Sequence, residues 1–266
     1  MSWITARRRH PAAGYTVVLL GLIAIGIVYA AVTTHGSPAS AAAPAAGGQD
    51  IAVGKHIFTD YCSSCHGGLA QGTANGPSLI GVGAAAVDFQ VSTGRMPAKE
   101  PGAENPRKPP VLNMRETHQV AAYIASLGGG PAIPGPEQVT PVGANAGLGQ
   151  ELFITDCAQC HSFTGAGGAL TEGKYAPALT RSTPTQIYEA MLTGPEAMPI
   201  FDDTTITPSQ KRDIIAYVTQ VRSVPNPGGF SLGRIGPVTE GLVVWFGGMG
   251  LLVFAALWIT ARRRES

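Results

Sequence analysis

The four cysteines of this chain are the residues whose spacing points most directly to a chemistry. All four fall in two C-x-x-C-H segments, CSSCH at 62–66 and CAQCH at 157–161. A lone C-x-x-C pair is compatible with a thioredoxin-type redox pair or half of a zinc site, but a histidine directly after it is typical of covalent haem attachment. The sequence therefore predicts two covalently bound haem c groups, with thioether bonds at Cys62, Cys65, Cys157 and Cys160.

The spacing inside each motif supports this interpretation over its alternatives. Cys62, Cys65 and His66 stand at i, i+3 and i+4 and therefore share one helix face. Two thiols can then bond the porphyrin edge while the imidazole reaches the iron. A tetrahedral zinc site would need four ligands converging from separated pairs, and a disulfide across two residues closes too short a loop to add much stability.

The predicted axial ligands of the haem irons are a histidine and a methionine in each copy. His66 and His161 follow the cysteines, and Met96 and Met198 are each followed by proline, which biases the preceding residue toward extended backbone. Such a loop can hold a thioether over the haem face. His/Met ligation fills both axial positions and raises the reduction potential, which favours electron transfer over peroxide or oxygen chemistry. The alternatives left open are gap-filling methionines, and Met114, Met191 or His118 as the sixth ligand.

An internal duplication positions these residues twice. The segment from Gly54 to His66 matches Gly149 to His161 at an offset of 95 residues, and the matches continue through Pro77/Pro177, the Met-Pro loops and a closing apolar segment. Two copies with one order of features indicate two copies of one domain. Each copy covers only about 75 residues, a size at which cores are marginal without a staple such as a covalent cofactor.

The periodicity predicts helices at 54–61, 116–127, 149–156 and 209–222, with Gly- and Pro-rich loops between them and no convincing strand. The expected fold class is all-α: two tandem class I cytochrome c domains between an N-terminal and a C-terminal transmembrane helix. The expected segments are a basic flank at 1–13, a transmembrane helix or signal anchor at 14–34, linkers at 35–50, 129–147 and 225–240, haem domains at 51–128 and 148–224, a transmembrane helix at 241–261 and a basic tail at 262–266.

Both ends of the chain carry apolar stretches long enough to cross a bilayer, which needs roughly 20 helical residues. The first could instead be a cleaved signal peptide, although its apolar run exceeds the usual signal core. Three arginines precede the first stretch and three follow the second, so the positive-inside rule predicts cytoplasmic termini and haem domains on the extracytoplasmic side of the cell membrane. Residues 33–240 hold 12 basic and 16 acidic side chains, a net charge of −4, and nothing indicates nucleic acid binding.

Taken together, the two CxxCH copies, the two Met-Pro loops and the C-terminal apolar stretch resemble the dihaem cytochrome cc subunit of the actinobacterial cytochrome bc complex, over the full length. The resemblance implies a subunit of a quinol–cytochrome c reductase (a proton-coupled translocase), in which the chain itself is an electron carrier without catalytic residues. Its implied partners are cytochrome b, a Rieske iron–sulfur subunit and a haem–copper terminal oxidase with a binuclear copper centre. It also implies electron flow from the Rieske centre to the first haem, then the second haem, then the oxidase.

Two other functions stay open at this point. One is a dihaem peroxidase-like enzyme, which needs one five-coordinate iron. The other is a dihaem cytochrome of another membrane dehydrogenase or oxidase, which more often has only an N-terminal anchor. The copies also differ in one place: 27 residues separate Met96 from Tyr123, against 19 between Met198 and Tyr217. The excess includes residues 97–110, which we expect to be a solvated loop or a docking surface for a partner subunit.

Overall fold

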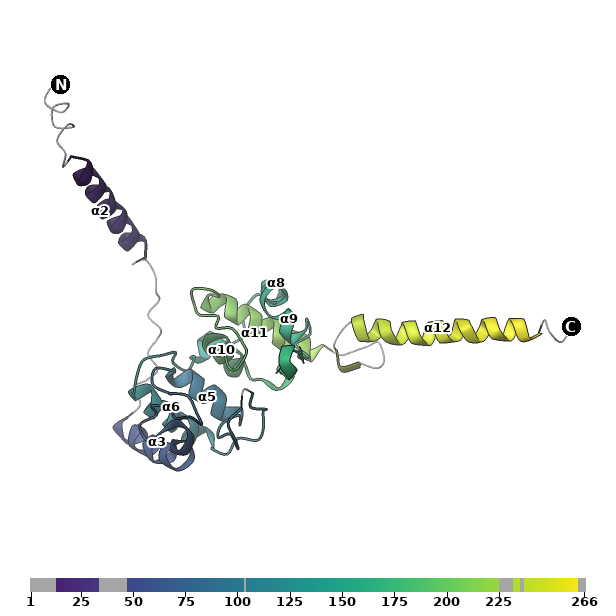
Figure 1. Ribbon diagram of the computed structural model, residues 1–266, viewed down its shortest axis with the longest axis horizontal. Helices are drawn as coiled ribbons and strands as arrows, with labels where there is room; N and C mark the ends of the chain where they lie inside the picture. The colour runs from purple at the N-terminus through teal and green to yellow at the C-terminus, as the bar shows by residue number, and fades with distance from the viewer. Residues whose placement is uncertain (1–12, 34–46, 103, 225–231, 235–236, 263–266) are drawn as a thin grey trace, which may run out of the picture. The chain divides into compact units, whose positions relative to one another are not determined.

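The computed structural model describes residues 13–33, 47–102, 104–224, 232–234 and 237–262 (Figure 1). The chain divides into two compact units, residues 1–42 and 43–266. In the first unit the described part is one helix, α2 (Ala13–Thr33). Residues 1–12 of the predicted basic flank, residues 263–266 of the basic tail and most of the linkers at 35–50 and 225–240 lie outside the described residues.

The second unit contains two helical lobes, each with its own hydrophobic core. The first lobe, residues 48–133, contains α3 (Gly48–Tyr61), α4 (Ser63–His66), α5 (Gly83–Ser92) and α6 (Met114–Ser126). The start of α6 is fixed by a capping box, in which the Glu116 amide donates to Asn113 Oδ1 at 3.1 Å and the Asn113 amide donates to Glu116 Oε2 at 2.8 Å.

The second lobe, residues 134–224, repeats this plan with additional short elements. Its α-helices are α7 (Pro136–Val139), α8 (Ala146–Asp156), α9 (Ala158–His161), α10 (Pro184–Thr193) and α11 (Pro208–Ser223), with 3₁₀ turns η1 (Thr171–Gly173) and η2 (Leu179–Arg181). Strand β1 (Gly168–Ala169) pairs antiparallel with β2 (Tyr175–Ala176), with Gly168 opposite Ala176. A further 3₁₀ turn, η3 (Leu232–Arg234), lies beyond the lobe.

The same helix crossing forms the centre of both lobes. Helix α3 packs against α6 in the first lobe, and α8 packs against α11 in the second. A Cβ added at Gly54 would overlap the carbonyl oxygen of Gln119, so only glycine allows this close approach. Next to the crossing, the rings of Phe58 and Tyr123 lie 5.4 Å apart with an interplanar angle of 53°.

The second lobe has the matching contacts, so the two lobes pack their long helices in the same way. A Cβ at Gly149 would overlap the carbonyl oxygen of Asp213. The Phe153 and Tyr217 rings lie 5.3 Å apart with an interplanar angle of 51°. The repeated sequence thus produces a repeated core, in which one aromatic residue from each long helix packs beside the crossing.

Three expectations about local structure were wrong. Helices α5 and α10 occupy stretches that we expected to be loops, and the β1–β2 hairpin was not foreseen. For α10 a readable signal existed, because Thr183, Pro184 and Gln186 form a capping box with proline at the first turn. The predicted linker at 129–147 is partly structured, since it contains α7, which packs on α10 and α11.

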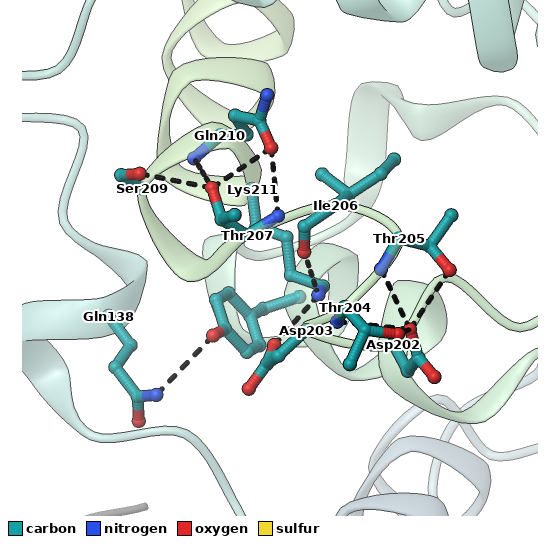
Figure 2. Close-up of polar contacts among 11 residues, drawn as sticks. Gln138, Asp202, Asp203, Thr204, Thr205, Ile206, Thr207, Ser209, Gln210 and Lys211 are labelled. Carbon is teal, nitrogen blue, oxygen red and sulfur yellow. Dashed lines mark hydrogen bonds and ion pairs between the residues drawn. The ribbon is translucent and has the colours of Figure 1, made fainter. Parts of the chain in front are cut away.

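A buried lysine ties the loop after Met198 to the second core (Figure 2). Lys211 Nζ donates to Asp203 Oδ1 at 2.8 Å and to the Ile206 carbonyl at 2.6 Å. It also lies 5.7 Å from the ring centroid of Tyr188, whose hydroxyl accepts a hydrogen bond from Gln138 Nε2 at 3.3 Å. The ion pair and the hydrogen bonds offset the desolvation cost of burying this charge.

Beyond the lobes, α12 (Pro237–Arg262) is a long apolar helix (Figure 1). Its residues Gly241–Ala261 form the only segment within the described parts of the chain that is long and apolar enough to cross a membrane. Helix α2 contains a shorter apolar stretch, Val18–Ile27. The protein is therefore mostly helical, with one apolar C-terminal helix suited to membrane anchoring.

Candidate haem-binding sites

The first lobe encloses a cavity of about 540 Å³ where its predicted site residues meet. Cys62, Cys65 and His66, on the turn from α3 into α4, line the cavity together with Met96, from the loop after α5. Apolar side chains complete the wall: Phe58, Leu79, Val87, Val91, Val120 and Ile124. An apolar slot with a few converging ligands is the form expected of a cofactor site.

The second lobe encloses a smaller cavity, of about 280 Å³, with the same arrangement. Cys157, Cys160, His161 and Met198 all line it. Of the alternative ligands, Met191 also lines this cavity, whereas Met114 is 59% exposed and belongs to neither lining. The structure thus brings each predicted set of two cysteines, one histidine and one methionine to a single cavity.

A backbone carbonyl orients each histidine. His66 Nδ1 lies 2.7 Å from the Pro77 carbonyl oxygen, and His161 Nδ1 lies 3.0 Å from that of Pro177. A proton on Nδ1 donated to the carbonyl leaves the lone pair of Nε2 free for a metal. Burial lowers the pKa of His161, which favours this neutral form. Pro77 and Pro177 match in the sequence repeat, but no sequence pattern indicated that their carbonyls accept these hydrogen bonds.

The environment of one cysteine in each motif favours the uncharged thiol over the thiolate. Burial, followed by the nearby Cys65, raises the pKa of Cys62 to about 11. Burial, followed by Asp156 and Cys160, raises the pKa of Cys157 to about 12. A zinc site needs deprotonated thiols, whereas a thioether carries no charge. Among the described residues no group of three or more His, Cys, Asp or Glu side chains converges as a metal site would require. Two cysteines, a histidine and a methionine around an apolar cavity are a donor set that fits a thioether-linked haem.

Helix α5 forms a wall of both cavities. Its residues Ala86, Val87, Gln90 and Val91 line the first cavity, whereas Phe89, on another face of the same helix, lines the second. Helix α5 also packs directly against α10 of the second lobe. The two cavities thus share α5 as part of their walls, an arrangement that no sequence pattern revealed.

The longer loop of the first lobe contacts the second lobe, so the expectation of a solvated loop at 97–110 holds only in part. The Asn105 amide donates to Glu196 Oε1 at 2.8 Å, and Arg107 donates to Gln186 Oε1 at 3.1 Å. Glu104 accepts a hydrogen bond from the Tyr175 amide at 3.2 Å. Sequence analysis missed this role because the contacts span 71 to 91 residues of chain.

Comparisons with known proteins agree with this geometry. The family model described as "Cytochrome C oxidase, cbb3-type, subunit III" matches residues 49–124 and 144–218, which fall in the two lobes. The cytochrome bc1 complex cytochrome c subunit of Corynebacterium diphtheriae is 42% identical over 97% of this chain and 98% of its own length. That of Mycobacterium tuberculosis is 43% identical over 96% of this chain and 93% of its own. That of Mycobacterium leprae is 48% identical over 80% of this chain and 75% of its own.

The family model and the relatives carry different names, and coverage decides between them. The model matches only the two lobes, whereas the relatives match almost the whole chain, including the C-terminal apolar helix. The name of the model therefore describes the kind of domain, and the relatives describe the whole protein. The chain belongs to the family of cytochrome bc1 complex cytochrome c subunits, and its role is electron transfer by haem c.

Proposed function

We propose that this chain carries two covalent haem c groups in two tandem class I cytochrome c domains and passes electrons through them in series. The first haem is bonded to Cys62 and Cys65, with His66 and Met96 as axial ligands. The second uses the matching set, Cys157, Cys160, His161 and Met198. The observation that carries the proposal is the convergence of each complete set on one cavity.

The placement of the methionines supports electron transfer over catalysis on oxygen or peroxide. Both Met96 and Met198 line the same cavities as the histidines. A bound haem would supply a one-electron redox couple, and methionine ligation would raise the potential of that couple. The side chains of the two lobes orient the imidazoles, present a methionine to each cavity and line it with an apolar wall.

The proposed route begins at a Rieske iron–sulfur subunit, which with cytochrome b forms the quinol-oxidising part of the complex. Electrons would then pass to the first haem and on to the second, whose cavity shares the α5 wall, before leaving to a haem–copper oxidase with a binuclear copper centre. The names of the full-length relatives support membership of such a complex. The α5 wall that the two cavities share supports transfer within the chain.

The proposed topology has two membrane spans, at 14–34 and 241–261, with both termini cytoplasmic and the lobes on the extracytoplasmic side of the cell membrane. The apolar helix at Gly241–Ala261 supports the second span. The helical form of α2 supports the first. Anchoring near both ends would hold the haems close to their partners, which replaces diffusion with a high effective concentration.

The number of haems is tested by mass and pyridine haemochrome measurements on the purified full-length chain. We expect two haems per chain, and one in a chain that carries Cys157→Ala and Cys160→Ala. The mass also reports whether the N-terminal helix is retained. A wild-type preparation with fewer than two thioether-linked haems would refute the proposal.

The order of transfer is tested in the complex purified by a tag on this chain, with quinol as the reductant. Without the second haem (Cys157→Ala, Cys160→Ala), quinol should still reduce the first haem, while oxygen consumption stops. Without the first haem (Cys62→Ala, Cys65→Ala), the second haem should stay oxidised. If the second haem were reduced at the wild-type rate in that variant, the proposed order would be wrong. Copurification of cytochrome b, Rieske and oxidase subunits tests the partners.

A further inference from the structure

The two haem cavities differ in which lobe forms their walls. Every residue lining the first cavity belongs to the first lobe. The second cavity is lined by its own lobe and also by four residues of the first lobe, namely Phe89, Arg95, Glu104 and Arg107. Two of these four are arginines. The first lobe therefore contributes positive charge to the cavity of its neighbour.

Arg95 is buried, and its hydrogen-bonding capacity is not fully used. Its side chain is 7% exposed, and its Nε makes no hydrogen bond to any described residue. The ion pair from Nε to Glu196 Oε1 is 3.8 Å long, well beyond the 2.7–2.9 Å usual for a charge-assisted hydrogen bond. The Arg95 guanidinium also lies 5.0 Å from the ring centroid of Phe89, which helps to hold it at the cavity.

The carboxylates in the same wall are already engaged by backbone amides. Glu196 accepts from the Asn105 amide at 2.8 Å, and Glu104 accepts from the Tyr175 amide at 3.2 Å. Arg107 donates to Gln186 Oε1, a neutral acceptor. Neither arginine therefore has a close bidentate carboxylate partner, although guanidinium groups are suited to one.

The two arginines of the wall lie close to each other, although Glu104, Asp156 and Glu196 also line the cavity. Burial lowers the pKa of Arg107, and the charges of Arg95 and Arg181 lower it further. Like charges held close together at a partly buried site favour a bound anion. A haem c group presents two propionate carboxylates at one edge of its ring, and a carboxylate there would give Arg95 Nε the close anionic partner that Glu196, at 3.8 Å, does not provide.

We propose that Arg95 and Arg107 of the first lobe bind the propionates of the haem in the second lobe, so that this haem site is completed by both lobes. The inference rests on the proposed function, because it requires a haem in the second cavity. It assigns the longer loop of the first lobe a role in the neighbouring site. The two arginines act as positioning residues that stabilise the reduced haem, since nearby cations favour the form with one more electron.

The test is a spectroelectrochemical redox titration of the purified full-length chain. Arg95→Gln and Arg107→Gln should each lower the equilibrium constant for reduction of the second haem about tenfold, which lowers its reduction potential by about 59 mV for one electron. The equilibrium constant for reduction of the first haem should change by less than about threefold. Met198→His, which changes an axial ligand of the second haem, identifies its wave in the titration.

Two further variants separate this role from a structural one. Arg95→Lys keeps the charge and should retain most of the wild-type potential, whereas a purely structural arginine would not be rescued in this way. Arg115→Gln removes an exposed arginine on α6 of the first lobe and should shift neither haem. If Arg95→Gln fails to bind haem, Arg107→Gln at the partly exposed edge provides the same test.

Haem counting makes the two possible failures distinguishable. A preparation with fewer than two haems in the wild-type chain contradicts the proposed function itself. Two haems per chain with an unshifted second haem in both glutamine variants overturns only the propionate assignment. An equal shift of both haems would also overturn it, because the arginines would then act through the general charge of the protein.

Discussion

The loop that follows the methionine differs most between the two lobes. In the first lobe this loop extends to the second lobe, where Asn105 and Arg107 bond to Glu196 and Gln186. In the second lobe the corresponding loop is tied to its own closing helix. The duplicated core therefore kept its haem-binding plan, while the loops diverged in the direction of their contacts.

The contacts of the second loop show how it is held. Thr204 and Thr205 donate to Asp202 Oδ1, and these hydrogen bonds lower the pKa of Asp202 to about 2. Lys211 then fastens the end of the loop through the Ile206 carbonyl. A loop that is bonded to its own closing helix in this way does not extend to the other lobe. The first lobe therefore contributes contacts to the second lobe, whereas the loop of the second lobe, among the described residues, forms its hydrogen bonds within its own lobe. Variants in each lobe test this asymmetry.

The largest effect is expected at the part the lobes share, the helix crossing. Gly54→Val should prevent folding of the first lobe and Gly149→Val that of the second, because each new side chain would overlap a backbone carbonyl. Overpacking of a core costs about 1–3 kcal/mol, and overlap with backbone should exceed this. The measurement is haem content per chain, which should fall toward one for Gly54→Val.

A matched control is available on the same helix. A Cβ at Gly48, the first residue of α3, meets no atom within 4 Å, so Gly48→Ala should keep full haem content. Because the second cavity takes part of its wall from the first lobe, Gly54→Val should also disturb the second haem. Gly149→Val should leave the first haem intact. Equal damage from both variants would argue against the asymmetry.

The next effect concerns the two methionines. Met96→His should lower the reduction potential of the first haem, and Met198→His that of the second, because thioether ligation raises the potential of a haem. The shift should exceed that of any arginine variant, since it acts on the iron directly. Redox titration checks this, with Met114→Leu, at an exposed position outside both cavities, as the control. A large shift in the control would point to Met114 as a ligand.

Much of the site was predictable from sequence because it is local or repeated. The C-x-x-C-H motifs place two cysteines and a histidine within five residues, and the Met-Pro dipeptides stand out in both copies. The long helices were predictable from their apolar periodicity, and the apolar C-terminal helix from its length. Each of these signals lies within one short window of sequence or within a repeat that can be aligned to itself.

The rest depends on contacts between distant segments. Helix α5 was missed because its sequence, GAAAVDFQVS, has small residues and no strong apolar stripe. Its place between two cavities follows from packing against α10 of the other lobe. The buried Lys211 was not foreseen either, because a lysine at the start of a helix is ordinarily solvated. No local pattern distinguishes such residues from surface residues.

A smaller effect is expected from the buried lysine. Lys211→Met keeps most of the side-chain volume but leaves the buried Ile206 carbonyl without its donor, which should cost about 1–3 kcal/mol of unfolding free energy. Thr117 occupies the corresponding position in the first lobe, six residues before the packed tyrosine. Thr117→Val should cost less, because its hydroxyl donates to Asn113 O, which already accepts the Thr117 amide.

Urea denaturation followed by haem absorption measures both variants. The Asp203 side chain is about half exposed, so water can solvate its carboxylate when Lys211 is replaced, and the loss of the ion pair adds little to the cost in unfolding free energy. If Thr117→Val proved as costly as Lys211→Met, the second loop would be no more firmly held by its own core than the first, and the contrast between the loops would weaken.

The last effect, small over any single pH unit, is expected where the lobes touch through carboxyl groups. Glu189 on α10 is fully buried, and among the described residues neither of its carboxyl oxygens has a hydrogen-bond partner of normal geometry. Burial, and then the nearby Asp88 of α5, raises the pKa of Glu189 to about 10. Asp88 in turn lies 3.5 Å from His118 Nε2. At neutral pH Glu189 is therefore protonated in the folded chain.

The sign of the pH dependence follows from this proton. Between the ordinary glutamate pKa of 4.5 and about 10, the folded state binds a proton that the unfolded state releases. Unfolding free energy should then fall as pH rises, by at most about 1.4 kcal/mol per pH unit. Glu189→Gln should remove this slope between pH 6 and 9, as measured by urea midpoints. Glu151→Gln, exposed on α8, is the control. An unchanged slope in Glu189→Gln would mean that the lobes meet without a shared proton.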